Sequence, residues 1–99
     1  MNAYELVEII RQKPGFYLHG KSLKQLHSLI IGYEIGAKQG ISSDFRPFNR
    51  WLAKELGFGE PTSGWCNMIS ARAESDEKAF DLFFELLDRF RKEGRGKEA

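Results

Sequence analysis

The sequence contains one cysteine, two histidines and no long apolar run, and each scarcity excludes a class of protein. Cys66 alone cannot form an internal disulfide, so the chain is not a disulfide-stabilised scaffold. Together with His19 and His27 it offers none of the paired spacings of a zinc site, and we expect no bound metal. No apolar stretch approaches the roughly 20 residues that cross a bilayer, so we expect no membrane contact.

Net charge and targeting features are also scarce. Fifteen Lys and Arg residues oppose fourteen Asp and Glu residues, which leaves a net charge of +1. This balance gives no global field to attract nucleic acid, so composition disfavours that partner. The first residues lack the basic and apolar segments of a signal peptide. A cytoplasmic protein is therefore expected.

Residues that could carry catalysis are few. Cys66 follows Trp65 in an apolar stretch, which is typical of a small buried hydrophobic residue, and nothing identifies either histidine as its general base. No carboxylate stands out in the apolar setting that would raise its pKa for acid catalysis. We therefore expect no enzyme, no cofactor and no small-molecule substrate. The sequence predicts a protein that binds another macromolecule.

The chain is rich in apolar residues at helical spacing. It is 41% hydrophobic and contains eight Phe, two Trp and three Tyr residues, which is ample for one packed core. Two cores would each be too small to offset the entropy of ordering their residues. We predict an all-α fold, a compact single-domain bundle of four to five helices over residues 1–93. Residues 94–99 lack an apolar anchor and are expected to form a frayed tail.

Two helices are predicted in the first 40 residues. Asn2 caps the first helix and Pro14-Gly15 ends it. Residues 16–20 are too short for an independent element and are expected to connect the two helices. The second helix extends from Ser22 to near Gly40.

Two features of this second helix stand out. Ser22 and Gln25 have the spacing of a capping box. Glycines recur at Gly32, Gly36 and Gly40, and each interior glycine costs about 1 kcal/mol relative to alanine. We expect close packing of another helix of the same chain to offset this cost.

The second half of the chain has similar signals. Ser43 or Asp44 caps a third helix that has Pro47 in its first turn and Gly57 at its end. Residues 65–72 fit either a short helix or a strand. A last helix begins at Ser75 or Asp76 and ends near residue 93. Its predicted inward face consists of Ala79, Phe80, Phe83, Phe84, Leu86, Leu87 and Phe90.

Acidic residues define the outward face of the last helix. Within about 80° of arc lie the four residues of the acidic stripe, Glu77, Asp81, Glu85 and Asp88. One interpretation is an ordinary solvated face, moderated by ion pairs of Glu85 with Arg89 and of Asp88 with Lys92. The other is a patch that complements a basic partner, such as the substrate groove of a nuclease.

The basic residues of the predicted third helix leave open a second hypothesis for the function of the chain. Arg46, Arg50 and Lys54 are the cations that a nucleic-acid-recognition helix would need. The same helix presents large apolar residues and is no richer in base-reading side chains than a typical solvated face. A small helical nucleic-acid-binding or regulatory protein is therefore the alternative.

Three stretches carry a resemblance to a known family. They are Lys13-Pro14-Gly15-Phe16-Tyr17-Leu18, the helix from Ser22 to Tyr33, and Ala79-Phe80-Asp81-Leu82-Phe83-Phe84-Glu85-Leu86-Leu87-Asp88-Arg89-Phe90. In this order they resemble small immunity-type proteins encoded beside bacterial polymorphic toxins of the contact-dependent-inhibition and Rhs types. The resemblance implies that the chain binds a cognate protein toxin and inhibits it stoichiometrically. Besides the acidic stripe, Tyr17 and Trp65 are candidate partner-binding residues if they are exposed.

Overall fold

Helices make up most of the part of the chain that the computed structural model describes, namely residues 3–36, 45–58 and 64–94. They are α1 (Ala3–Gln12), α2 (Pro14–Tyr17), α3 (Leu23–Gly36), α4 (Arg46–Leu56), α5 (Gly64–Arg72) and α6 (Asp76–Arg89), which continues into a π-helical turn, η1 (Phe90–Gly94). No strand occurs in these ranges, and the radius of gyration is 12.8 Å. The predicted compact all-α fold is confirmed. None of these helices is long and apolar enough to span a bilayer.

The helix count is slightly higher than predicted because a short helix, α2, lies in the expected connector. Pro14 has the φ angle that a first helical turn needs, and the Leu18 amide donates to the Pro14 carbonyl at 2.8 Å. Leu18 is buried, whereas the Phe16 side chain is 79% exposed. One side chain therefore anchors this segment to the core.

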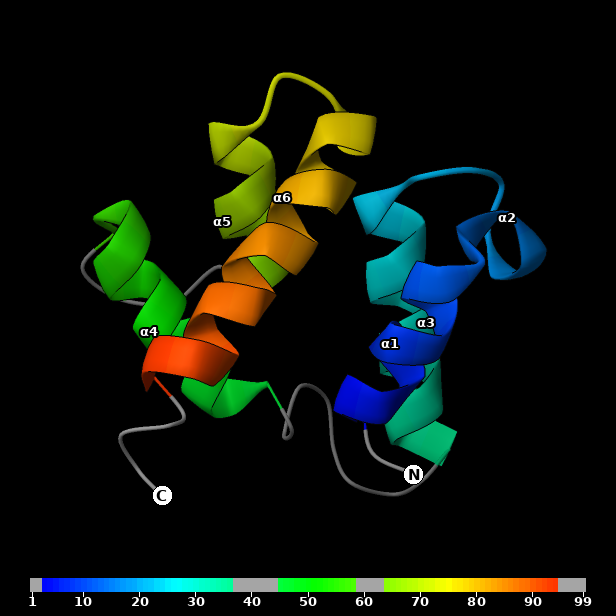
Figure 1. Cartoon of the computed structure of the whole chain (residues 1–99), viewed down its shortest axis with the longest axis horizontal. Coiled ribbons are helices and arrows are strands. Elements are labelled where there is room, and N and C mark those ends of the chain that lie inside the picture. The colour runs from blue at the N-terminus through cyan, green and yellow to red at the C-terminus, as the bar shows by residue number, and fades with distance from the viewer. Residues whose placement is uncertain (1–2, 37–44, 59–63, 95–99) are drawn as a thin grey trace.

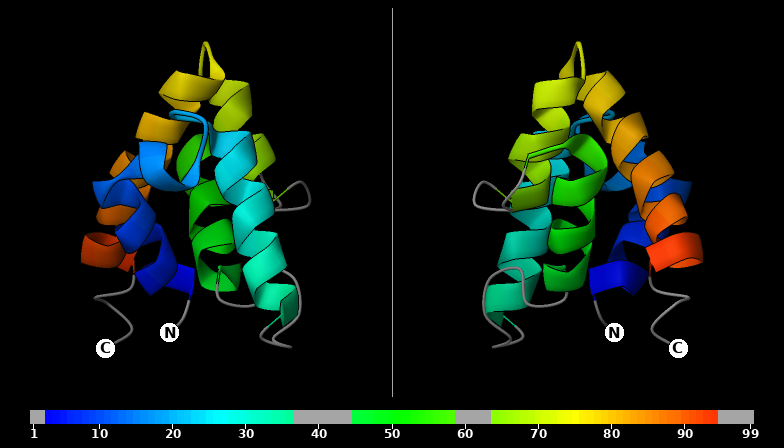
Figure 2. Two further views of the ribbon diagram at one scale, coloured as in Figure 1. Left: turned by 90° about the vertical axis from the view of Figure 1, so that its right-hand side faces the viewer. Right: turned by 90° about the vertical axis from the view of Figure 1, so that its left-hand side faces the viewer.

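The helices form two groups that α3 joins. Figure 1 shows α4, α5 and α6 on the left and α1, α2 and α3 on the right. Helix α3 packs against α1 in its own group and against α5 and α6 in the other. In Figure 2 it runs along one edge of the molecule. One face of α3 is therefore buried, and no described helix covers the opposite face.

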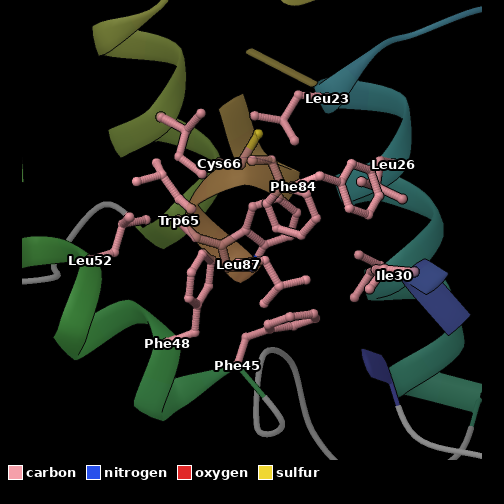
Figure 3. Packing of buried hydrophobic residues seen from close by; sticks show 14 of the residues in the cluster. Leu23, Leu26, Ile30, Phe45, Phe48, Leu52, Trp65, Cys66, Phe84 and Leu87 are labelled. Atoms are coloured by element: carbon pink, nitrogen blue, oxygen red, sulfur yellow. The ribbon is translucent and has the colours of Figure 1, made fainter. Parts of the chain in front are cut away.

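The core is built around the inward face of α6, whose predicted residues are all buried. Phe83 is fully buried, with its ring centroid 4.8 Å from that of Trp65 on α5 and 5.9 Å from that of Phe48 on α4. Figure 3 shows Phe48, Trp65 and Phe84 in one cluster with aliphatic side chains of α3 such as Leu26. The 3.6-residue periodicity thus identified the core face of this helix correctly.

Two of the predicted helix starts have side-chain caps. The Ser75 hydroxyl accepts a hydrogen bond from the Lys78 amide at 3.1 Å, so Ser75 is the cap of α6. The Ser22 hydroxyl accepts from the Gln25 amide at 3.2 Å. The Gln25 side chain accepts instead from the His19 amide at 2.9 Å, so Gln25 ties the preceding loop to the helix.

One carboxylate joins the starts of α3 and α6. Asp76, in the first turn of α6, accepts hydrogen bonds from the Leu23 amide at 3.0 Å and from the Lys24 amide at 3.2 Å. It also accepts a short hydrogen bond from the Ser22 hydroxyl. The first amides of α3 have no partners within their own helix, and Asp76 supplies them from a neighbouring one. The two helix N-termini share this negative charge, which both helix dipoles favour.

The remaining boundaries follow their predicted signals. Pro47 lies in the first turn of α4, and Gly57 ends it with φ of 76°, the left-handed conformation that glycine adopts most readily. Residues 65–72 are helical, which resolves the choice between helix and strand. The proposed caps Asn2, Ser43 and Asp44, the helix end near Gly40 and the tail beyond Gly94 lie outside the described residues.

The expected packing of a neighbouring helix against the glycines of α3 is wrong for the two glycines that the structure describes. Gly32 and Gly36 are exposed. A Cβ atom added to either would meet no described atom within 4 Å. Both glycines lie on the face opposite to the one that packs in the core, and Gly40 is outside the described ranges. The cost of these glycines is not offset by close packing inside the described fold.

We expect Asp76→Ala to lower the free energy of unfolding by about 2 kcal/mol, because three donors at the start of α3 lose a charged acceptor. Urea denaturation monitored by circular dichroism measures this. Glu77→Ala is the control, since it removes a carboxylate from the same turn of α6 that makes no described hydrogen bond, and we expect less than about 0.5 kcal/mol. Equal losses in the two variants would contradict the capping role of Asp76.

Candidate functional site

The acidic stripe lies on the outer surface of α6. Glu77, Asp81 and Glu85 are exposed and Asp88 is half-buried, on the side of the helix away from the aromatic core. This arrangement follows from the sequence, because Ala79, Phe83 and Leu86 occupy the opposite arc of α6, whereas Phe80 and Phe84 flank the stripe. The four acids therefore share one open surface, as predicted.

Asp88 is held by α1 through a two-point ion pair. The Arg11 guanidinium donates to Asp88 Oδ1 at 2.9 Å and to Oδ2 at 2.6 Å. Arg11 also lies 5.0 Å from the centroid of the Phe84 ring and 3.4 Å from a Glu8 carboxylate oxygen. The hydrogen bonds from Arg11 lower the pKa of Asp88 and raise that of Arg11, since they favour both charged forms. Asp88 is thus a structural link between α1 and α6.

A second acid of the stripe is neutralised from the loop before α3. Lys21 Nζ lies 3.2 Å from Asp81 Oδ1. The ion pairs predicted within α6 are not the ones that form: Asp88 pairs with Arg11, and Arg89 reaches Glu55 on α4 at 2.6 Å. Partners from other helices prevail because α1 and α4 bring cations and acids against the flanks of α6.

The other two acids of the stripe, Glu77 and Glu85, form no ion pair with a described residue. Glu85 borders an open groove of about 760 Å³ between α1 and α6, the α1–α6 groove. Its lining consists of Glu8, Arg11, Glu85, Asp88, Arg89, Arg91 and Lys92. A smaller groove of about 380 Å³ adjoins it at Arg11, Glu85 and Asp88. The candidate site is this surface with its two grooves.

The α1–α6 groove alternates charges of opposite sign. Arg91, beyond the end of α6, lies 3.4 Å from the Glu8 carboxylate and 5.8 Å from the centroid of the Tyr4 ring. Glu8 also lies 3.4 Å from Arg11, which pairs with Asp88, so Arg91, Glu8, Arg11 and Asp88 form a chain of alternating sign. Glu85 lines the same groove. The grooves thus offer a set of fixed, exposed charges rather than an enclosed apolar pocket.

The two aromatic candidates do not join the acidic stripe. Trp65 is 1% exposed and packs against Phe83, so it does not meet the condition of exposure on which it was a candidate. Tyr17 is 46% exposed and lines a different groove of about 490 Å³ with residues of α3 that include Lys24 and Leu29. The predicted residues therefore divide into the α6 surface, a separate α2–α3 groove and the core.

Cys66 and His27 are placed for packing. Burial raises the pKa of the Cys66 thiol, which favours the protonated form at neutral pH. Burial lowers the pKa of His27, whose ring meets that of Trp65 edge-on at 5.0 Å. In the part of the chain that the structure describes, no group of His, Cys, Asp and Glu is arranged to hold a metal ion.

Sequence reasoning missed Arg11 and Lys21 as members of this surface. Arg11 is 77 positions from Asp88, so no local spacing signals their contact. The ends of α1 and of the loop before α3 reach α6 only through the tertiary fold. Helical periodicity identified the acids because all four lie on α6. It could not identify Arg11 and Lys21, because these lie on other segments of the chain.

The Arg11–Asp88 pair predicts a pH-dependent contribution to stability. The folded-state pKa of Asp88 lies below its unfolded value of about 3.9, so the pair stabilises the fold above this pH and its contribution is lost as the pH falls through the folded-state pKa. The side chains are 37% and 48% exposed, so we expect Asp88→Asn to cost about 1 kcal/mol at pH 7.

Denaturant unfolding of Asp88→Asn and of the wild type between pH 7 and pH 2.5 tests this expectation. The difference between the two proteins should be constant from pH 7 to pH 5 and should shrink below about pH 4. Glu74→Gln removes the carboxylate of a more exposed pair, 81% exposed on the Glu74 side, and should have a smaller effect. A difference for Asp88→Asn that stays unchanged down to pH 2.5 would show that charge is not its source.

The chemistry available at the α6 surface is electrostatic recognition by fixed charges of both signs. Two of its acids form intramolecular ion pairs, and the other two form none with a described residue. Comparison of the chain with protein-family models, with curated proteins and with solved structures finds no match.

Proposed function

We propose that this chain is an immunity-type protein that binds a cognate bacterial toxin and neutralises it by stoichiometric protein–protein inhibition. The observation that carries the proposal is that charges of both signs line the α1–α6 groove, and that neither Glu85 in this groove nor Glu77 on the same stripe forms an ion pair with a described residue. The resemblance of three stretches of the sequence to immunity-type proteins supports it independently.

The charge pattern favours a folded protein over a uniformly charged polymer. A polyanion that approached Arg89, Arg91 and Lys92 would also meet acids such as Glu85. A polycation drawn to the acids would meet the same cations. A protein surface with its own pattern of acids and bases can match both signs, and such complementarity gives specificity and speeds association.

Inhibition of this kind requires contact and no chemistry by the chain. A standard interface buries about 800 Å² on each partner, a modest share of the 6099 Å² surface of this chain. The α6 surface with its two grooves would provide the centre of such an interface. The bound chain would then cover the active site of the toxin or another surface that the toxin needs.

Co-expression with the product of the neighbouring gene tests the proposal. We expect the chain to restore growth of cells that produce this product. We expect Glu77→Lys with Glu85→Lys to weaken the purified complex at least tenfold, mainly by slowing association, because both substitutions reverse charges that attract the partner. Neither side chain has a described ion pair, so the fold should be retained.

The control for charge reversal is Glu74→Lys, which reverses an exposed carboxylate that precedes α6 and is not part of the stripe. It should bind as the wild type does. Failure of the wild-type chain to protect against the neighbouring product would refute the immunity function. Protection together with full affinity of the double variant would instead refute the α6 surface as the contact.

A second candidate, nucleic-acid binding, is favoured by one feature of α4. Arg46, Arg50 and Lys54 are exposed at four-residue spacing, and none forms an ion pair with a described residue. Such a basic stripe could contact phosphates along a backbone. Three contacts supply weak, non-specific affinity.

Retention on duplex DNA tests this candidate. If the basic stripe binds, log affinity should fall linearly with log salt with a slope of about −2.7, the value for three phosphate contacts. Arg50→Glu should abolish retention, whereas Lys78→Glu on α6 should not. Absence of retention in about 20 mM salt would remove the candidate.

A further inference from the structure

The outer face of α3 differs from the outer faces of the other long helices. Solvent-facing positions of α6 such as Glu77, Asp81 and Glu85 are charged. We call the exposed and half-buried residues of α3 the α3 outer face. They are Lys24, Gln25, His27, Ser28, Leu29, Ile31, Gly32, Tyr33, Ile35 and Gly36. Lys24 is the one residue of this set that is charged at neutral pH. Because the solvated face of a surface helix normally carries several charged residues, this nearly uncharged face is suited to contact with another protein.

The centre of this face is smooth and its edges are apolar. At 100° per residue, Ser28, Gly32 and Gly36 fall within about 80° of arc. Leu29 and Ile35 lie about 60° to either side of Gly32, and they are 37% and 57% exposed. Small residues thus lie at the centre of this face between two exposed apolar side chains, and no described atom lies within 4 Å of a Cβ added at Gly32 or Gly36.

We propose that the α3 outer face binds a second copy of this chain, with the two α3 helices antiparallel and crossing at Gly32. In this arrangement a two-fold axis passes beside Gly32 and places each Leu29 over Gly36 of the other copy. Each Ile35 then lies over Ser28 of the other copy. Large residues meet small ones on both sides, so the face is complementary to itself, as a two-fold interface requires. Backbones can approach closely at glycine.

The charge of the face favours the antiparallel direction. Antiparallel packing brings each Lys24 toward the C-terminal end of the other α3, where helix carbonyls carry partial negative charge. The two Lys24 side chains are then separated by about 24 Å along the helix axis, beyond the Debye length at physiological salt. A parallel pair would place the two lysines at the same level and align the helix dipoles unfavourably. Only the antiparallel copy therefore satisfies both shape and charge.

The exposed aromatic residues of α2 extend the contact. Tyr17 lines the α2–α3 groove beside Leu29, and the Phe16 ring packs edge-on against that of Tyr17 at 5.1 Å. In the antiparallel pair this corner lies near Gly36 of the other copy. A helix of 14 residues is about 21 Å long, so the contact is small by the standard of stable dimers. We expect a dissociation constant on the order of 100 µM.

Sedimentation velocity between about 10 µM and 1 mM tests the proposal. The average mass of the wild type should rise from 11.4 kDa toward twice that value. Gly32→Leu and Gly32→Glu should remain monomeric, the first because its side chain blocks close approach and the second because two carboxylates would meet at the crossing. Both should fold at least as well as the wild type, since no described atom lies near the added Cβ and glycine weakens a helix.

Ala71→Glu is the matched control, because it adds the same charge to an exposed position of α5 and should self-associate as the wild type does. A monomeric wild type at 1 mM, or Gly32 variants that associate like the wild type, would overturn the proposal. A monomeric wild type whose binding to the neighbouring gene's product is lost in Gly32→Glu would also overturn it, since the face would then accept a different protein.

Single cysteines distinguish the two directions. Under oxidation Gly32→Cys should form a covalent dimer, because the two positions meet at the crossing. Gly36→Cys should not, because antiparallel copies place these residues about 12 Å apart along the axis. Ready cross-linking of Gly36→Cys would indicate parallel helices and contradict the proposed arrangement. The self-association is independent of the proposed function, since the α3 outer face lines neither groove of the α6 surface.

Discussion

The burial of Phe83, on α6, against aromatic residues of α4 and α5 is the interaction on which the rest of the structure depends. Its ring contacts those of Phe45, Phe48 and Trp65, which precede or belong to α4 and α5. Large aromatic groups bury more apolar surface per residue than any others, so this cluster fixes the orientation of α6. Once the aromatic arc of α6 faces inward, its acidic arc must face outward. The candidate binding surface is therefore a consequence of the core.

Polar contacts at both ends of α6 then attach the first three helices to this core. At its start, Asp76 accepts hydrogen bonds from the amides of Leu23 and Lys24. Toward its end, Asp88 holds Arg11 of α1. These contacts use acids that the sequence alone assigns to helix capping or to the exposed face. Intramolecular contacts thus neutralise part of the acidic charge of α6. Glu77 and Glu85, which form no ion pair with a described residue, are the acids that we expect to attract a partner most strongly.

Sequence patterns predicted the features that depend on the residues of a single helix, and they missed the contacts between residues of two helices. The inward face of α6, its Ser75 cap and the end of α4 at Gly57 follow from periodicity and capping preferences, and all three are confirmed. The partner of Asp88 could not be predicted, because Arg11 lies on a distant helix. Gly32 was expected to face a helix of the same chain, yet it lies opposite Leu26 and Ile30, the side of α3 that packs in the core.

The central claim is that the outer surface of α6 contacts a partner protein, and hydrogen–deuterium exchange tests it most directly. The chain should be measured alone and in complex with the product of the neighbouring gene. The account predicts slower exchange in residues 77–88 and at the end of α1 in the complex, with no change in α4. Slower exchange confined to α4, or no change in α6 at saturating partner, would contradict it.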